Sequence, residues 1–151
     1  MTQRLDYTTL AAGGMKALGG VYGYVSRSEL PASLIDLVYL RVSQINGCAY
    51  CISLHTRDLL KAGTPYGKLA MLVAWREAGA LFDEDERAAL GWAETVTRVA
   101  ETGVPDAAFA AASARFEPKA LVDLTLAIGV INSFNRMAIS FRAVPLSIPT
   151  R

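Results

Sequence analysis

Apolar side chains recur with helical spacing along most of this 151-residue chain, and short polar or proline-containing segments interrupt them. The stretch from 30 to 45 is apolar on nearly all sides, which is typical of a deeply buried helix. The stretch from 117 onward repeats apolar residues every three or four positions, as one face of a long helix does. We therefore predict an all-α protein with a single domain that spans residues 1–151.

Residues that start or stop helices divide this pattern into about six or seven elements. Pro31, Pro65 and Pro118 stand where a first helical turn tolerates proline. Asp83 and Glu86 have the spacing of a capping box, so the acidic run there predicts a helix start rather than a metal site. The expected helices cover 5–25, 30–45, 47–62, 64–79, 83–103, 105–116 and 117 to about 142, followed by an extended tail over 145–151.

One short polar segment, Asn46 to His55, holds both cysteines and the only histidine of the chain. On a helix, Cys48 and Cys51 stand at positions i and i+3, and Cys51 and His55 at i and i+4, so all three share one face. Asn46 and Gly47 are turn residues, and Asn46 is a candidate N-cap for this helix. Because a helix start and a nearby imidazole both lower the pKa of a thiol, the segment predicts dithiol redox chemistry.

A few polar residues interrupt helices that are otherwise apolar. Asp36 lies in the buried stretch 30–45, where a carboxylate must be paired, hydrogen-bonded or protonated. It is therefore a candidate for function as much as for a structural salt bridge, and Arg41 is a weaker exception in the same stretch. Asn132, Asn135 and Arg136 form a second polar group within the last helix.

Composition and charge narrow the choice of partners and compartment. Hydrophobic residues make up 52% of the chain, which is rich for a small domain, so we expect part of the apolar surface to be buried in a homo-oligomer. A formal charge of +1 without a basic stripe argues against a nucleic-acid partner. No apolar run approaches the length of a membrane span, and no export signal opens the chain. We expect a cytoplasmic protein that does not enter the membrane, in which a Cys-x-x-Cys pair is more often catalytic or metal-binding than structural.

Four kinds of site contain a Cys-x-x-Cys pair followed by a histidine. A haem-attachment site needs histidine directly after the second cysteine, where this chain has Ile52. A structural zinc site needs four ligands, so a carboxylate, a water or a second subunit would have to complete the three that this segment offers. A thioredoxin fold needs strands around the motif, and the pattern here is helical. A helical dithiol enzyme remains the favoured interpretation, with zinc as an alternative.

The segment 37–51 reads LVYLRVSQINGCAYC and is followed by His55 and by LysAlaGly at 61–63. Together they closely resemble the core of the alkylhydroperoxidase AhpD-like family, which shares its helical fold with carboxymuconolactone decarboxylases. The resemblance continues in AWRE at 74–77, DERAALGWAE at 85–94 and NRMAI at 135–139, and it covers roughly residues 33–142.

What the resemblance implies is a thiol-dependent peroxidase of hydroperoxides that serves in antioxidant defence. In the family the second cysteine attacks the peroxide and becomes a sulfenic acid, and the first then condenses with it to a disulfide. Carried over here, Cys51 is the peroxidatic thiol, Cys48 is the resolving thiol and His55 belongs to a proton relay. The resemblance implies no bound organic cofactor, an external dithiol reductant such as a lipoyl domain or a thioredoxin-like protein, and an oligomer for which a hexamer is favoured over a trimer or dimer.

Two departures from the family pattern concern the proton relay. The family commonly has a glutamate twelve residues before the first cysteine, where this chain has the shorter Asp36, so we expect Asp36 to act in the relay with a water bridging the gap. Some members have a histidine just before the second cysteine, where this chain has Tyr50. Two further functions stay open: a redox sensor or dithiol-disulfide partner without turnover, and a carboxymuconolactone decarboxylase-like enzyme, against which the Cys-x-x-Cys pair argues.

Overall fold

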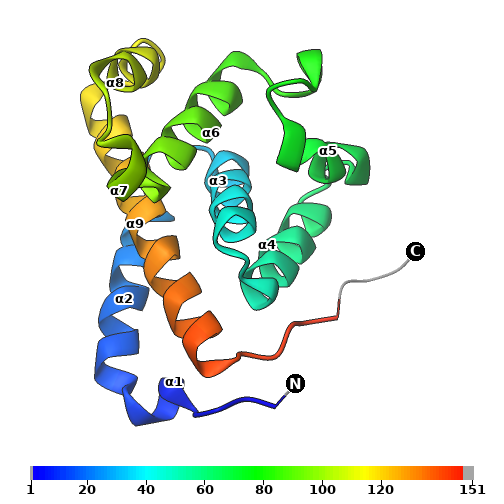
Figure 1. Cartoon of the computed structure of the whole chain (residues 1–151), viewed down its shortest axis with the longest axis vertical. Helices are drawn as coiled ribbons and strands as arrows, with labels where there is room; N and C mark the ends of the chain where they lie inside the picture. The colour runs from blue at the N-terminus through cyan, green and yellow to red at the C-terminus, as the bar shows by residue number, and fades with distance from the viewer. Residues whose placement is uncertain (1, 148–151) are drawn as a thin grey trace.

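The computed structural model describes residues 2–147, and within this range the predicted all-α architecture is confirmed (Figure 1). Nine α-helices and two 3-10 turns follow one another in the described chain, and six of the helices have eight residues or more. The longer helices are α2 (Ala12–Val25), α3 (Ala32–Asn46), α4 (Ala49–Lys61), α6 (Glu84–Thr97), α8 (Asp106–Ser113) and α9 (Pro118–Phe141). The shorter elements are α1 (Tyr7–Leu10), α5 (Tyr66–Met71), η1 (Leu72–Ala74), η2 (Gly79–Leu81) and α7 (Val99–Thr102).

Helix α3 is the central element of the fold. It packs against α4, α6 and α9, while α2 lies alongside α9 (Figure 1). The predicted burial of the 30–45 stretch is confirmed, because eight of the fifteen residues of α3 are buried. Val38 and Val42 of α3 belong to the same core cluster as Leu124 and Ile128 of α9. The start of α4, which carries the cysteines, is thus placed between the end of α3 and the second half of α9.

Helix α9 is long and apolar enough to span a bilayer by length and composition alone. One side of it is buried against α2, α3 and α6, which is the arrangement expected of a core helix in a globular protein. Its polar residue Asn135 is fully buried and its neighbour Asn132 is half-buried, both on the part of the helix that faces α3 and α4.

Three of the expected helices are interrupted. The expected helix 5–25 breaks at Ala11, whose backbone is not helical, so α1 and α2 are separate. The expected helix 64–79 is present only as α5 and η1, and turns follow in which the carbonyls of Trp75, Arg76 and Gly79 accept hydrogen bonds from the guanidinium of Arg87. The expected helix 83–103 divides at Arg98 into α6 and α7.

Other expectations about helix ends are met. The capping box of Asp83 and Glu86 is present at the start of α6, as predicted. The segment 143–147 is non-helical, and the rest of the expected extended tail lies outside the described residues.

Arg41, the weaker polar exception of the buried stretch, forms a mostly buried ion pair that connects α3 to α6. Its Nη2 lies 2.7 Å from Oε1 of Glu94, and its Nε donates to the same oxygen at 2.8 Å. The indole Nε1 of Trp75 donates to this oxygen at 2.9 Å, and Arg76 pairs with the other carboxylate oxygen at 2.6 Å. These four residues lie in the segments that carry the family resemblance, and their contacts give those segments a structural role.

Candidate active site

The turn between α3 and α4 places the cysteine pair. Gly47 ends α3 with a φ of 72°, a left-handed conformation that glycine adopts without steric cost. Cys48 is the N-cap of α4, and its Sγ accepts a hydrogen bond from the N–H of Cys51 at 3.3 Å. The prediction that Asn46 caps this helix is wrong, because Asn46 is the last residue of α3. The expected position of the cysteines in the first turn of a helix is confirmed.

Asn46 instead belongs to a cluster of side-chain amides that fixes this turn to α9. Its Nδ2 donates to the Oδ1 atoms of Asn132 and Asn135, at 2.9 Å in each case. Asn135 in turn donates to Oγ of Ser43 at 3.0 Å, and the carbonyl of Ser43 accepts the backbone N–H of Cys48 at 2.9 Å. Through Ser43, these hydrogen bonds connect Asn135 of α9 to the backbone of Cys48. They also give the buried polar side chains of this turn the partners that such groups need.

The two cysteines lie within disulfide-bonding distance, with Cα atoms 5.4 Å apart. Both are buried, with exposed fractions of 1% for Cys48 and 3% for Cys51. The chain after α9 covers them: Ala143 packs against their cluster, and the N–H of Leu146 donates to Oγ of Ser53 on α4 at 2.9 Å. The two cysteines differ in their surroundings: Cys51 lines a pocket, and Cys48 is not among the residues that line it.

His55 lies one turn after Cys51 on α4 and approaches Asp36 on α3. Its Nδ1 is 3.7 Å from Oδ1 of Asp36, a distance too long for a direct hydrogen bond. The side chain of His55 is 4% exposed and that of Asp36 is 25% exposed, so the carboxylate keeps contact with solvent. The structure thus brings together all four residues that the sequence selected, with Asp36 at the edge of the group.

The pocket next to Cys51 has a volume of about 290 Å³ and walls from α1, α2, α4 and α9. Its lining residues are Tyr7, Thr8, Met15, Gly19, Tyr22, Tyr50, Cys51, Leu54, His55, Ile131, Phe134 and Ala138. Within the described chain, no Asp, Glu, Lys or Arg is among them, so the pocket is suited to a neutral and largely apolar molecule.

The N-terminal segment closes one side of this pocket. The ring of Tyr7 stacks on that of Phe141 at the end of α9, with centroids 5.5 Å apart. The backbone N–H of Arg4 donates to the carbonyl of Phe141 at 2.9 Å, and its guanidinium donates to that of Ser140 at 3.1 Å. These contacts hold α1 over the pocket.

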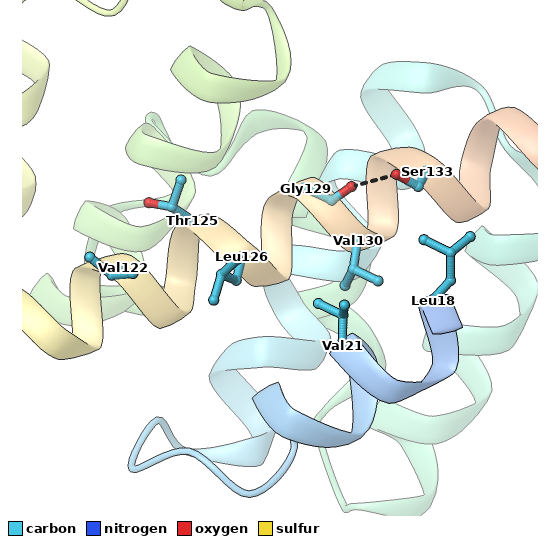
Figure 2. A pocket seen from close by; sticks show the side chains of 8 residues that line it. All are labelled: Leu18, Val21, Val122, Thr125, Leu126, Gly129, Val130 and Ser133. Carbon is cyan, nitrogen blue, oxygen red and sulfur yellow. Dashed lines mark hydrogen bonds between the residues drawn. The ribbon is translucent and has the colours of Figure 1, made fainter. Parts of the chain in front are cut away.

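A larger cavity of about 480 Å³ lies between α2 and α9, away from the cysteines (Figure 2). Val21 of α2 lies next to Val130 of α9, Leu18 of α2 points toward the turn of α9 near Ser133, and Leu126 and Val122 extend the apolar surface along α9 (Figure 2). Among the residues that the structure describes, those that line this cavity include hydroxyl groups but no thiol, imidazole or charged group.

Several pocket residues were not identified from the sequence. Tyr22 and Phe134 line the pocket, and their rings are 6.3 Å apart in an edge-to-face contact. Burial raises the pKa of the Tyr22 phenol, and the charges of Asp36 and Asp58 raise it further. The tyrosine could have been found only by knowing that α2 packs against α9 next to the pocket, which helical spacing alone does not reveal.

The zinc alternative finds no support in the geometry. Among residues 2–147, no three Cys, His, Asp or Glu side chains are grouped so that they could hold a metal ion. The two cysteines are paired with each other, and the third member of the group is an imidazole whose nearest acidic neighbour is Asp36.

Known proteins resemble this chain along nearly its whole length. Residues 12–95 match the model of the carboxymuconolactone decarboxylase family. YdfG, an uncharacterised protein of Bacillus subtilis (strain 168), is 36% identical over 140 residues, which are 93% of this chain and 95% of that protein. YnjA of Escherichia coli (strain K12), also uncharacterised, is 32% identical over 106 residues, which are 70% of this chain and 57% of that protein.

Solved structures show the same architecture. A protein of unknown function from Agrobacterium tumefaciens, for which a role as the antioxidant defence protein AhpD has been suggested, superposes with a TM-score of 0.92. It is 38% identical, and the match covers 97% of this chain and 99% of that one. The debrominase Bmp8 shares the fold at a TM-score of 0.74 and 18% identity, over 88% of this chain and 71% of its own. The chain therefore belongs to the carboxymuconolactone decarboxylase family, with the fold of its AhpD-like members.

Proposed function

We propose that this protein is a thiol-dependent peroxidase that reduces organic hydroperoxides, with Cys51 as the peroxidatic thiol. The observation that carries the proposal is the placement of three groups: Cys51 and His55 line one pocket, and Cys48 lies behind Cys51 within disulfide-bonding distance. A thiol that faces a substrate pocket, a base beside it and a second thiol in reach are the parts that such a reaction requires.

The reaction proceeds in three balanced steps. His55 accepts the proton of the Cys51 thiol, and the thiolate attacks the distal oxygen of the hydroperoxide, so that the O–O bond breaks and Cys51 becomes a sulfenic acid. The alkoxide that leaves takes the proton from His55 and departs as an alcohol. The Cys48 thiol then attacks the sulfenic sulfur and releases water, which leaves the disulfide. An external dithiol reduces this disulfide to two thiols and is itself oxidised.

The pocket favours a neutral, apolar substrate. Its walls are mainly aromatic and aliphatic, and none of the side chains that line it in the described structure carries a formal charge. A volume of about 290 Å³ accommodates a small aryl or alkyl group beside the reacting sulfur. A hydroperoxide with a carboxylate would have to be desolvated without a cationic partner, which costs free energy.

The test is single-turnover oxidation of the fully reduced protein by cumene hydroperoxide, with wild type, Cys51→Ser and Cys48→Ser compared. Wild type should lose both thiols rapidly. Cys51→Ser should lose the fast phase, and Cys48→Ser should stop at a sulfenic acid that dimedone traps. Wild-type oxidation no faster than that of a free thiol would contradict the proposal and favour a decarboxylase-like activity. Rapid oxidation without repeated turnover in the presence of dithiols would favour the sensor.

We further propose that copies of this chain associate through the face formed by α2 and α9. Only Val25 is buried among the fourteen residues of α2, and Val21, Val122 and Leu126 are exposed around the larger cavity (Figure 2). Since α2 also contributes to the pocket at Cys51, a second copy packed here would hold that wall in place. A hexamer is our first expectation, and a trimer or dimer the second.

Light scattering measures the assembly directly. Leu126→Glu should convert the oligomer to smaller species, because a charge would be buried against apolar side chains, whereas the exposed control Val99→Glu should not. A monomeric wild type would contradict this assignment. A cytoplasmic location, where lipoyl or thioredoxin-like dithiols are available as reductants, is part of the same proposal.

A further inference from the structure

Tyr39 is a buried residue of α3 that faces the candidate active site. It lies one turn after Asp36 on the same helix, and its exposed fraction is 1%. Its ring centroid is 5.1 Å from that of His55 and 5.6 Å from that of Tyr22. Tyr39 therefore fills the space between the histidine of the site and a tyrosine of the pocket wall.

The hydroxyl of Tyr39 has no hydrogen-bond partner. Within residues 2–147, two buried side-chain polar atoms lack one, and they are Tyr39 Oη and Nδ1 of the neighbouring His55. An unpaired buried hydroxyl destabilises a fold, and phenylalanine would fill the same space without this cost. Two unpaired groups on adjacent rings point to a hydrogen-bond arrangement that is completed in another state of the site.

Asp36 is a hydrogen-bond acceptor close to both groups. It is one turn from Tyr39 on α3, and its Oδ1 is 3.7 Å from Nδ1 of His55. Burial raises the pKa of Tyr39, and the charges of Tyr22 and Asp36 raise it further, so the phenol stays protonated and remains a donor. The other titratable groups that line the pocket with His55 are Cys51 and the phenols of Tyr7, Tyr22 and Tyr50, and α9 adds none in the described chain. Asp58, one turn after His55 on α4, is close enough for its charge to raise the pKa of Tyr22.

We propose that Tyr39 is a positioning residue for His55: its hydroxyl accepts the Nδ1–H of the neutral imidazole and donates its own hydrogen to Asp36. This bridge fixes the tautomer in which Nε2 carries no proton and can accept that of the Cys51 thiol. In the structure Nδ1 and Oδ1 are 3.7 Å apart with no hydrogen bond between them, so the hydroxyl of Tyr39 can supply the link that a direct contact does not. The inference rests on the proposed role of Cys51 as a reactive thiol.

The variant Tyr39→Phe tests this directly, because it removes one oxygen atom and preserves the ring. We expect single-turnover oxidation by cumene hydroperoxide at neutral pH to slow about tenfold. This is less than the whole effect of a general base, because His55 itself is still present. The dependence of the rate on pH should also change, because the tautomer of His55 is no longer held. Tyr24→Phe is the control, since Tyr24 donates to Asp123 far from the cysteines. Thermal unfolding of each variant shows whether the fold is intact.

A purely structural role predicts the opposite pattern. Tyr39→Phe would then keep the wild-type rate and pH profile, with an equal or higher Tm, and this result would overturn the proposal. Alkylation of the reduced protein by iodoacetamide as a function of pH separates the two proposals, because it reports Cys51 reactivity without any peroxide. Slow oxidation by hydroperoxide in wild type, together with alkylation that is slower in Tyr39→Phe, would contradict the peroxidase and support the role of Tyr39. Equal alkylation of both proteins would overturn that role.

Discussion

The imidazole of His55 and the carboxylate of Asp36 face each other across the contact between α3 and α4, with Nδ1 3.7 Å from Oδ1. The separation exceeds that of a hydrogen bond, as the sequence led us to expect from a side chain one methylene shorter than the glutamate common in the family. Because Asp36 is still 25% exposed, it can change rotamer without repacking the core. The distance between the carboxylate and the imidazole can therefore change, and a substitution at position 36 can vary it experimentally.

Changing the length of this side chain should change the rate of thiol oxidation. Asp36→Glu should keep or increase the single-turnover rate, because the added methylene shortens the distance to His55. Asp36→Asn should lower the rate about tenfold or more, because the amide lacks the charge that stabilises the imidazolium. Stopped-flow measurement of Cys51 oxidation gives both numbers. Equal rates in Asp36→Asn and wild type would exclude Asp36 from the relay.

The neutral pocket should be convertible to one that accepts an anion. Leu54 lines the pocket and is only partly buried, so a longer side chain is tolerated there. Leu54→Arg should slow the reaction with cumene hydroperoxide and accelerate that with a fatty-acid hydroperoxide, whose carboxylate gains a partner. The ratio of the two rates is the quantity to measure, and Val99→Arg on the exposed α7 is the control. If the ratio of the two rates did not change, the substrate would not bind in the pocket that Leu54 lines.

The helical spacing of apolar residues was sufficient to predict the architecture, because α3, α4, α6 and α9 each bury a set of side chains along one face. The interruptions of the helices could not be predicted from spacing, which does not show contacts with other parts of the chain: the guanidinium of Arg87, for example, donates to the carbonyls of Trp75, Arg76 and Gly79 in the turns after η1. The cysteines and His55 were found because they share one face of a single helix, and Asp36 because it is a carboxylate in a buried apolar stretch at the position where the family commonly has a glutamate.

The residues missed in the candidate site come from other parts of the chain. Tyr22 reaches the pocket from α2, and Asn135 reaches the turn before Cys48 from α9. Sequence spacing relates residues within one helix but not between helices that are far apart in the chain. Asn135 was visible as a polar residue in an apolar helix, but its partner Asn46 was assigned to a cap instead.

The amide cluster predicts a specific defect in disulfide closure. Asn135→Ala should leave Ser43 and Asn46 with unpaired polar atoms and lower the free energy of unfolding by about 2 kcal/mol. It should also slow the attack of Cys48 on the sulfenic acid more than the oxidation of Cys51, because the turn that holds Cys48 is loosened. Dimedone trapping during a single turnover separates the two steps. Ser133→Ala is the control, since this exposed serine bonds only to the carbonyl of Gly129 on its own helix. Equal slowing of both steps would indicate a general loss of structure.

The ion pair of Glu94 gives the fold a defined dependence on pH. Burial by itself would raise the pKa of Glu94, but the hydrogen bonds from Trp75 and Arg41 and the charges of Arg41 and Arg76 outweigh it and lower the pKa. A carboxyl whose pKa is lower in the folded than in the unfolded state binds protons more readily when unfolded. Its stabilising contribution is therefore complete above the unfolded value, near 4.5, and disappears as the pH falls through the folded value.

Glu94→Gln should lower the free energy of unfolding by about 3 kcal/mol at pH 7, because Arg41 loses its charged partner in a mostly buried position. The difference between variant and wild type should shrink as the pH falls below about 4.5, where the wild-type carboxyl also becomes neutral. Urea unfolding at several pH values measures this difference, and the exposed Glu101→Gln serves as the control. A difference that stays constant down to acid pH would mean that Glu94 contributes through shape and hydrogen bonds, which the amide retains, rather than through its charge.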